Sequence, residues 1–408
     1  MKILKLTKIM ETIKKFIALL LLVSSSVYVN SQNNPDSLSE ELSALKGRIE
    51  AIDERVLLNE GDLNKLTKIK VSGYIQAQFE DYQTDLVKTG SPYNTFYIRR
   101  ARIKFTYEAS DGVKFVLQPD LITGSFSLKD AYAIVNLPGF KDLSLWAGQF
   151  NRPNYEVEYS SSQREVLERS RLIRTIYPGE REIGLKLEYN PSQTPLKLQI
   201  AMVNGNFTGT QAKDIDTKKD LMGRVVYSFM IPDVGIGIDL GAHGYYGGLR
   251  AKTKYVSNFD NELDSVNVGS YLDKKWFGAE MQLFFDFLGG VSLKGEYILG
   301  KNAFIGDSKT NPYKTRNFSG YYAYLIKNLG VKHQLVAKYD NFDPNSKLSG
   351  DAAGSDVKYN TLTLAWQYYI NDNIRLTVNY EMPKNETNSN VTTDLRDNVF
   401  GVRIQAKF

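Results

Sequence analysis

The segment 151–179 concentrates side chains that could bind an oxyanion. It contains no lysine, and its arginines, with one just beyond it, are Arg152, Arg164, Arg169, Arg171, Arg174 and Arg181. A guanidinium presents parallel N–H donors that match two oxygens of a phosphate-like anion, which an ammonium does less specifically. The acids of the same region are Glu156, Glu158, Glu165, Glu168 and Glu180. Two interpretations stay open: the arginines contact a passing anion, or they pair with these glutamates and hold the shape of a loop.

A second cationic group lies in an alternating segment at 94–108. Arg100, Arg102 and Lys104 share one face of an extended strand, because successive side chains of a strand point to opposite sides. Arg99 breaks this alternation, so either a β-bulge turns it to the same side as Arg100 or it lies at an interface. Fixed cations along a water-filled tube attract anions. Inward acids such as Glu80 and Asp120 would reduce this attraction for anions. The alternative is a lumen wall of mixed charge that selects neither anions nor cations.

The composition argues against enzymatic and metal chemistry. The chain has no cysteine and two histidines, His243 and His333, both inside alternating segments where a strand role is expected. Thiolate sites, disulfides and cysteine nucleophiles are therefore absent, and no nucleophile, base and orienting group can be assembled. We expect no enzymatic activity, no cofactor and no metal site. The net charge of +5 is modest, and an exported chain is not expected to bind nucleic acid.

Most of the chain reads as strands of period two. The last of them runs to Phe408, with an apolar row that includes Val402 and Ile404 and a polar row that includes Arg403 and Lys407. Sixteen strands are predicted, at about 71–81, 94–108, 113–121, 128–137, 142–150, 180–190, 195–204, 220–230, 234–246, 274–287, 290–300, 316–327, 330–341, 358–370, 373–382 and 397–408. The aromatic share of 12% suits a membrane barrel with aromatic girdles.

The connections between these strands alternate in length. Short turns such as 111–112 and 371–372 carry turn residues, whereas the segments between them include long polar loops at 151–179, 205–219, 247–273, 301–315, 342–357 and 383–396. Short turns on one side and long loops on the other are typical of an outer-membrane barrel with both termini in the periplasm. The predicted fold is therefore all-β: a 16-stranded antiparallel transmembrane β-barrel over 70–408, wide enough for a wet lumen.

Two segments precede the barrel. Residues 1–31 combine a charged start, an apolar run at 16–23 and small residues, which predicts a signal peptide, with Met10 as an alternative start. Residues 32–69 carry a heptad pattern and predict a helix. Its core positions are Leu42, Leu45, Ile49, Ile52, Val56, Leu63 and Leu66. Either it forms a short oligomerising coiled coil below the barrel, or one amphipathic helix packs on the protein's own surface or plugs the lumen.

The barrel segment resembles a known family, the phosphate-selective porins of the porin O and P type. The matching stretches are GYIQ at 73–76, FYIRRARIKF at 96–105, KDAY at 129–132, AGQFNRPNYEVEYSSSQREVLERS at 147–170 and YDNFDPN at 339–345, with similarity again at 374–380. The resemblance implies a sixteen-stranded, usually trimeric porin whose third external loop narrows the pore. It also implies an anion-binding zone at the arginine pair of the second strand, Arg99 and Arg100, and at the loop arginine Arg169.

Together these features predict a porin of the bacterial outer membrane. It would pass small hydrophilic solutes, preferably anions such as phosphate, with Arg99, Arg100, Arg102, Lys104, Arg164, Arg169, Arg171, Arg174 and Arg181 lining or narrowing the pore. The expected partners are outer-membrane lipid, two further copies in a homotrimer, and the barrel-assembly machinery, whose recognition signal the terminal Phe408 resembles. A barrel-anchored surface interaction protein is the alternative from another class. A sugar porin, with Tyr74, Tyr132 and Trp146 as an aromatic track, is the alternative among channels.

Overall fold

The computed structural model describes residues 43–49, 51–53, 55–56, 67–83, 93–122, 124–140, 142–205, 214, 216–258, 260–286, 289–305 and 313–408. The predicted signal peptide at 1–31 lies outside this range. The chain divides into two units, Met1–Thr67 and Lys68–Phe408. In the first unit the described residues 43–49, 51–53 and 55–56 are helical, and Leu45, Ile49 and Ile52 are exposed on this helix. The coiled coil stays a prediction.

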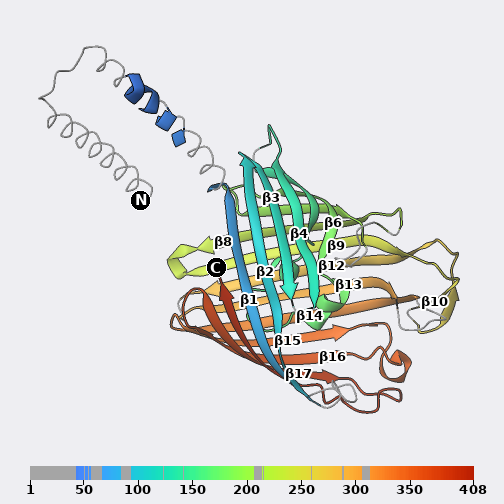
Figure 1. Cartoon of the computed structure of the whole chain (residues 1–408). Coiled ribbons are helices and arrows are strands. Elements are labelled where there is room, and N and C mark those ends of the chain that lie inside the picture. The colour runs from blue at the N-terminus through green and yellow to red at the C-terminus, as the bar shows by residue number, and fades with distance from the viewer. Residues whose placement is uncertain are drawn as a thin grey trace, which may run out of the picture. The chain divides into compact units, whose positions relative to one another are not determined.

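The second unit is a closed barrel of sixteen antiparallel strands, as predicted (Figure 1). The wall strands are β1 (Ile69–Tyr82), β2 (Asn94–Ser110), β3 (Val113–Ile122), β4 (Ser125–Asn136), β5 (Leu143–Asn151), β6 (Arg181–Tyr189), β7 (Leu196–Val203), β8 (Asp220–Ile231), β9 (Ile236–Arg250), β12 (Tyr271–Phe285), β13 (Val291–Ile305), β14 (Tyr313–Leu329), β15 (His333–Asp343), β16 (Tyr359–Tyr369), β17 (Ile374–Asn385) and β18 (Val399–Lys407). Each pairs with the next strand of the wall, and β1 pairs with both β2 and β18.

The seam between the first and last strands is closed by the chain terminus. Backbone hydrogen bonds of 3.0 Å join Gly73 and Phe408 in both directions. The Phe408 ring covers Gly73, where an added Cβ would lie 2.6 Å from the ring and 2.5 Å from the Arg102 carbonyl oxygen. A residue without a side chain is therefore required beneath the terminal aromatic.

Side chains alternate between a polar inner wall and an apolar outer wall. On β1, Gln76 and Gln78 are buried whereas Ile75 is 51% exposed, and on β18 Arg403 is buried whereas Ile404 is 47% exposed. This inverts the pattern of a soluble domain, since the charged residues are enclosed and the aliphatic ones face outward. Among the described residues, no helix has the length and apolar character needed to cross a membrane.

One predicted loop contains extra strands. The sequence indicated a loop at 247–273, but β9 runs on to Arg250, and a small hairpin of β10 (Tyr255–Ser257) and β11 (Leu263–Ser265) fills the middle. The Asn258 side chain accepts hydrogen bonds from the backbone N–H groups of Asp260 and Glu262, which closes the turn. The segment is too short and too polar to show an alternating pattern. Two single-turn 3-10 helices, Pro232–Val234 and Gly350–Ala353, lie in other connections.

Candidate functional site: an arginine constriction in the barrel lumen

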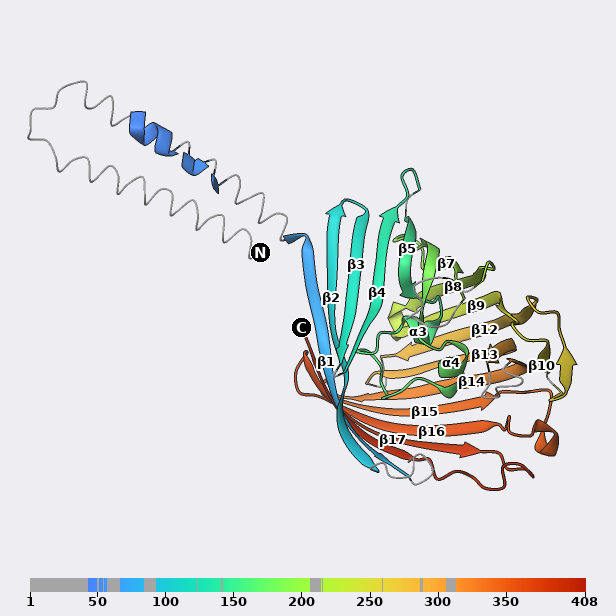
Figure 2. The same cartoon turned by 45° about the vertical axis from the view of Figure 1, so that its right-hand side comes forward.

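The segment 151–179 folds into the lumen and carries two short helices, α3 (Tyr155–Glu158) and α4 (Arg171–Ile176). Both lie on the inner side of the barrel wall in Figure 2. Asn154 caps α3 by accepting from Val157 N, and Ser170 caps α4 by accepting from Ile173 N. The Ser170 hydroxyl also donates to the Glu156 carboxylate at 2.8 Å, which ties the start of one helix to the other.

An apolar core holds this loop against one side of the wall. Its loop members are Tyr155, Val157, Val166, Leu172, Ile173, Ile176 and Tyr177. They pack with inward residues of β7 to β16, including Tyr245, Trp276 and Tyr322. Full burial of an aliphatic side chain contributes about 2 kcal/mol, so several together fix the loop. Two buried polar contacts add to this: Asn154 donates to Glu296 at 2.6 Å, and His243 Nε2 lies 2.5 Å from the same carboxylate.

A stretch of three serines fastens the loop to the opposite wall. The Ser161 carbonyl accepts from Gln76 at 3.0 Å, and the Ser162 carbonyl accepts from Gln405 at 3.0 Å and Arg375 at 3.1 Å. The Ser161 hydroxyl meets the Tyr74 hydroxyl and accepts from Arg102 Nη1 at 3.1 Å. The loop thus spans the lumen from β5 to β1 and β18.

A β-bulge in β2 turns two consecutive arginines inward. Gln76 pairs with Arg100, whereas the next residue, Ala77, pairs with Ile98, so Arg99 is an extra residue opposite the β1 strand. Arg100 is 3% exposed, and Arg99 Nε donates to the loop carboxylate of Glu168 at 3.0 Å. Of the two positions open to Arg99 from the sequence, the structure shows the bulge.

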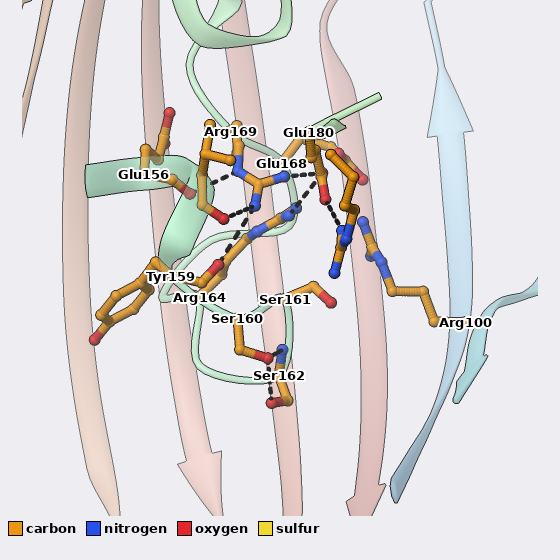
Figure 3. Close-up of polar contacts among 12 residues, drawn as sticks. Arg100, Glu156, Tyr159, Ser160, Ser161, Ser162, Arg164, Glu168, Arg169 and Glu180 are labelled. Carbon is orange, nitrogen blue, oxygen red and sulfur yellow. Dashed lines mark hydrogen bonds and ion pairs between the residues drawn. The ribbon is translucent and has the colours of Figure 1, made fainter. Parts of the chain in front are cut away.

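Three loop and wall arginines share one carboxylate. Arg164 and Arg169 both pair with Glu180, and Arg181 Nη1 donates to its other oxygen at 2.6 Å (Figure 3). Arg169 Nε also donates to the Glu156 carbonyl at 2.7 Å, and Arg181 pairs with Asp130 at 3.0 Å. Two carboxylates, Glu180 and Asp130, therefore pair with three guanidiniums, which leaves one cation in excess among these ion pairs.

Arg100 differs from these neighbours. It extends from β2 toward the cluster without a drawn contact in Figure 3. Its Nη1 donates to Gln76 Oε1 at 3.0 Å, and its Nε has no hydrogen-bond partner within the part of the chain that the structure describes. Within the same part, no carboxylate lies at ion-pair distance from Arg100, whereas Arg99 and Arg102 have Glu168 at 2.9 Å and Asp120 at 2.8 Å.

Two cavities lie on either side of Arg100. A cavity of about 470 Å³ at the long-loop end is lined by Arg99, Glu168, Arg171 and Arg174, among others. A cavity of about 320 Å³ toward the short-turn end is lined by Arg102, Lys104 and Arg181. On β2, Arg100 lies between Arg99, which lines the first cavity, and Arg102, which lines the second. We call Arg99, Arg100, Arg102, Arg164, Arg169 and Arg181 the arginine constriction.

Comparison with known proteins places this geometry in a family. A family model described as "Phosphate-selective porin O and P" matches residues 69–408. The chain belongs to the phosphate-selective porin O and P family. It is 24% identical to Porin O of Pseudomonas aeruginosa over 401 residues, which covers 85% of this chain and 89% of that protein. It is accordingly a porin of the bacterial outer membrane, a channel rather than an enzyme.

Solved structures show the same fold at low identity. An anion-selective porin from Comamonas acidovorans superposes with a TM-score of 0.56 at 13% identity, over 83% of this chain and 99% of that chain. The outer-membrane protein OmpT of Vibrio cholerae, in a trimer form, superposes with a TM-score of 0.52 at 11% identity, over 83% of this chain and 99% of that chain. These likenesses concern the fold of the porin.

The sequence-predicted residues of this porin separate into two groups. Arg99, Arg100, Arg102, Lys104, Arg164, Arg169 and Arg181 come together at or just below the constriction. Arg171 and Arg174 lie on α4 facing the long-loop cavity, where they pair with Asp397 at 3.9 Å and Glu381 at 3.5 Å. Each arginine of the loop set pairs with an acid, as the second interpretation expects, whereas Arg100 of β2 has no such pair in the described residues. Contact of the loop arginines with a passing anion stays a prediction.

Sequence reasoning missed the residues that organise the constriction. Asp130 and the serines Ser161 and Ser162 were not singled out, although the KDAY and SSS stretches that contain them were. Glu168 was named from the sequence only as one of the acids of the arginine-rich segment. Burial alone would raise its pKa, yet Arg99, Arg100, Arg164 and Arg403 hold the pKa of this carboxyl at about 2. The constriction therefore stabilises a negative charge at that position. In the described residues, no group of three or more histidine or acidic side chains could hold a metal ion.

Proposed function

We propose that this porin conducts small oxyanions, inorganic phosphate foremost, and that they are selected at the arginine constriction. The observation that carries the proposal is Arg100. Its guanidinium is enclosed and has no carboxylate at ion-pair distance among the described residues, and its neighbours on β2, Arg99 and Arg102, each line one of the two cavities. An enclosed cation in a low-dielectric site interacts with an anion far more strongly than one in bulk water.

The surrounding charges favour the same conclusion. Glu180 and Asp130 pair with the three guanidiniums of Arg164, Arg169 and Arg181, so this group has one cation more than it has acids. Asp120 and Asp130 orient Arg102 and Arg181 rather than lie free in the lumen. A phosphate has three acceptor oxygens that can take charge-assisted hydrogen bonds from such forks. The family's description as phosphate-selective and the Comamonas acidovorans porin's description as anion-selective agree with this solute class.

The test is a planar-bilayer measurement on the mature porin. In a KCl gradient the reversal potential should show preference for chloride over potassium, and added phosphate should reduce the chloride current by occupying the constriction. Arg100→Ala removes one charge-assisted donor, worth about 1.5–3 kcal/mol, and should weaken phosphate block by about tenfold or more. Arg250→Ala is the matched control, since this exposed arginine at the end of β9 lines neither cavity. Cation preference, or unchanged block in Arg100→Ala, would overturn the proposal.

We also propose that the porin assembles as a homotrimer. The V. cholerae OmpT structure of the same fold is described in a trimer form. The helix at 43–56 exposes Leu45, Ile49 and Ile52, whose spacing of four and three suits contact with the same helix of other copies. The mass of the purified particle, after subtraction of detergent, should equal three chains, and Ile49→Asp should lower the stability of that particle. A monomeric mass would contradict the assembly.

A further inference from the structure

A pair of aromatic side chains faces the lower cavity, the one lined by Arg102, Lys104 and Arg181. Tyr132 of β4 and Trp146 of β5 are half-buried, and their ring centroids lie 4.8 Å apart at an interplanar angle of 29°. Trp146 is fixed in place, because its Nε1 donates to Ser144 Oγ at 3.1 Å and Lys186 Nζ lies 3.7 Å from its ring centroid. Tyr132 is therefore the ring of the pair that the cavity can use.

The Tyr132 hydroxyl is also available. In the part of the chain that the structure describes, no hydrogen bond is made by this hydroxyl, whereas other lumenal tyrosines such as Tyr74 and Tyr322 are bonded. An aromatic ring with a polar tip offers one face for stacking and one group for hydrogen bonding. The cavity adds neutral polar groups from Gln118, Asn151 and Ser160.

The same cavity is lined by one cation that has no ion pair with the residues that the structure describes. The cavity's cations include Lys186, paired with Glu188 at 3.5 Å, and Lys197, paired with Glu158 at 3.0 Å. Lys104 makes no ion pair or hydrogen bond with any residue in the described ranges, although it lines the same cavity. Lys104 is on β2 and Tyr132 on β4, so one strand separates them and their backbones are roughly 10 Å apart across the wall.

We propose that this cavity is a second binding subsite of the porin, for phosphate monoesters that carry a ring, such as a phosphorylated sugar or nucleoside. The phosphate would contact Lys104 and the adjacent guanidinium of Arg102, and the ring would lie against Tyr132. A volume of about 320 Å³ is at the lower end for small-molecule sites, which suits a compact ligand of this kind. The inference deepens the proposed function, because it rests on oxyanions passing Arg100 and names the organic esters among them.

The site also follows from the order of the lumen. Arg99 lines the long-loop cavity, Arg100 follows it on β2 and donates to Gln76, and Arg102 and Lys104 line the lower cavity. Beyond Arg100 a monoester would meet Lys104 and the ring of Tyr132. The tyrosines of the long-loop cavity, Tyr82 and Tyr97, instead donate their hydroxyls to Glu80. An inorganic ion gains nothing from that ring, whereas an ester gains stacking.

The test compares four blockers of the chloride current through the mature porin: inorganic phosphate, glycerol 3-phosphate, glucose 6-phosphate and adenosine monophosphate. Stacking on an aromatic side chain is worth about 1–3 kcal/mol, so the ring-bearing esters should block at concentrations about tenfold below that of ringless glycerol 3-phosphate. Stronger block by glucose 6-phosphate or by adenosine monophosphate shows whether the subsite prefers the ring of a sugar or that of a nucleoside. Equal block by ringless and ring-bearing esters would overturn the inference.

Variants locate the effect. Tyr132→Leu should abolish the preference for ring-bearing esters. If that variant does not conduct, Trp146→Leu should weaken the preference, because Trp146 stacks on Tyr132 and supports its ring. Tyr227→Leu is the matched control, because Tyr227 is 49% exposed on the outer wall of β8, and it should keep the preference. A preference that survives in Tyr132→Leu would overturn the site. If ring-bearing esters block the current and inorganic phosphate does not, the proposed function is overturned and the subsite is supported. If neither inorganic phosphate nor the esters block the current, the proposed function and the subsite are both overturned.

Discussion

Glu168 offers a measure of how strongly the constriction attracts an anion. Its pKa is lowered from 4.5 to about 2, although it is largely enclosed and burial acts in the opposite direction. A change of about 2.5 pKa units corresponds to about 3 kcal/mol in favour of negative charge at this position. Arg99 at 2.9 Å and Arg403 at 3.7 Å are the cations in contact with the carboxylate. The protein's own carboxylate therefore occupies a site that a permeating anion would favour.

Replacing Glu168 by the isosteric glutamine should leave its partner cations free to attract a permeating anion instead. In Glu168→Gln the contact cations lose their internal anion, and phosphate should block the chloride current at lower concentration. A free energy of about 3 kcal/mol would lower the half-blocking phosphate concentration by roughly 100-fold at most. Screening by water and salt in the lumen should reduce this change to about tenfold. The assay is the half-blocking phosphate concentration of single channels in KCl, with unchanged open-channel conductance as evidence that the loop stays in place.

A matched control separates this effect from a general change of charge. Glu381→Gln also neutralises a paired glutamate, but its partner Arg174 is 43% exposed and lies on α4 above the constriction. Half-blocking phosphate should change by less than about twofold in that variant, because an exposed pair is screened. Weaker block in Glu168→Gln, or an equal increase in both variants, would refute the view that the constriction is a site of focused positive potential.

Three further outcomes are expected. Burial raises the pKa of Asp397 to about 6. Lowering the pH from about 7.5 to about 5 should therefore neutralise Asp397 beside Arg171 and increase the chloride preference measured by reversal potential. In Asp397→Asn the reversal potential should equal the low-pH value of the unmodified porin at both pH values. Leu172→Ala removes a fully buried anchor of the loop at a cost of about 2–5 kcal/mol and should raise single-channel conductance and current noise in KCl. Gly73→Val places a side chain where the Phe408 ring lies and should lower the fraction of chain that refolds into a closed barrel in detergent.

The barrel itself could be predicted because its signal is local. A period of two in side-chain polarity appears within each strand, and the alternation of short and long connections orders the strands around the wall. All sixteen strands were found this way, with ends that differ by a few residues. The hairpin of β10 and β11 was missed because three-residue strands carry no measurable period.

The arginine pair of β2 shows where a local pattern stops being sufficient. Strict alternation puts Arg100 on the inner wall and Arg99 on the outer side, so Arg99 either joins Arg100 through a bulge or lies at an interface. A single extra residue, which shifts the pairing with β1 between Gln76 and Ala77, is the bulge. A bulge depends on the register of the neighbouring strand, which the sequence of β2 does not contain. The sequence could therefore state the alternatives without deciding between them.

The sequence by itself determined that a polar and an apolar wall alternate along the strands, which loop is rich in arginine, and that the strands enclose a wet lumen. Tertiary structure alone decided which cations are neutralised. Arg164 and Arg169 pair with Glu180, which lies 16 and 11 positions further along the chain. Arg100 carries the same charge but donates to the neutral amide of Gln76. The physical reason is distance: polarity alternates between adjacent residues, but the field at a point in the lumen sums charges that folding brings together from across the barrel.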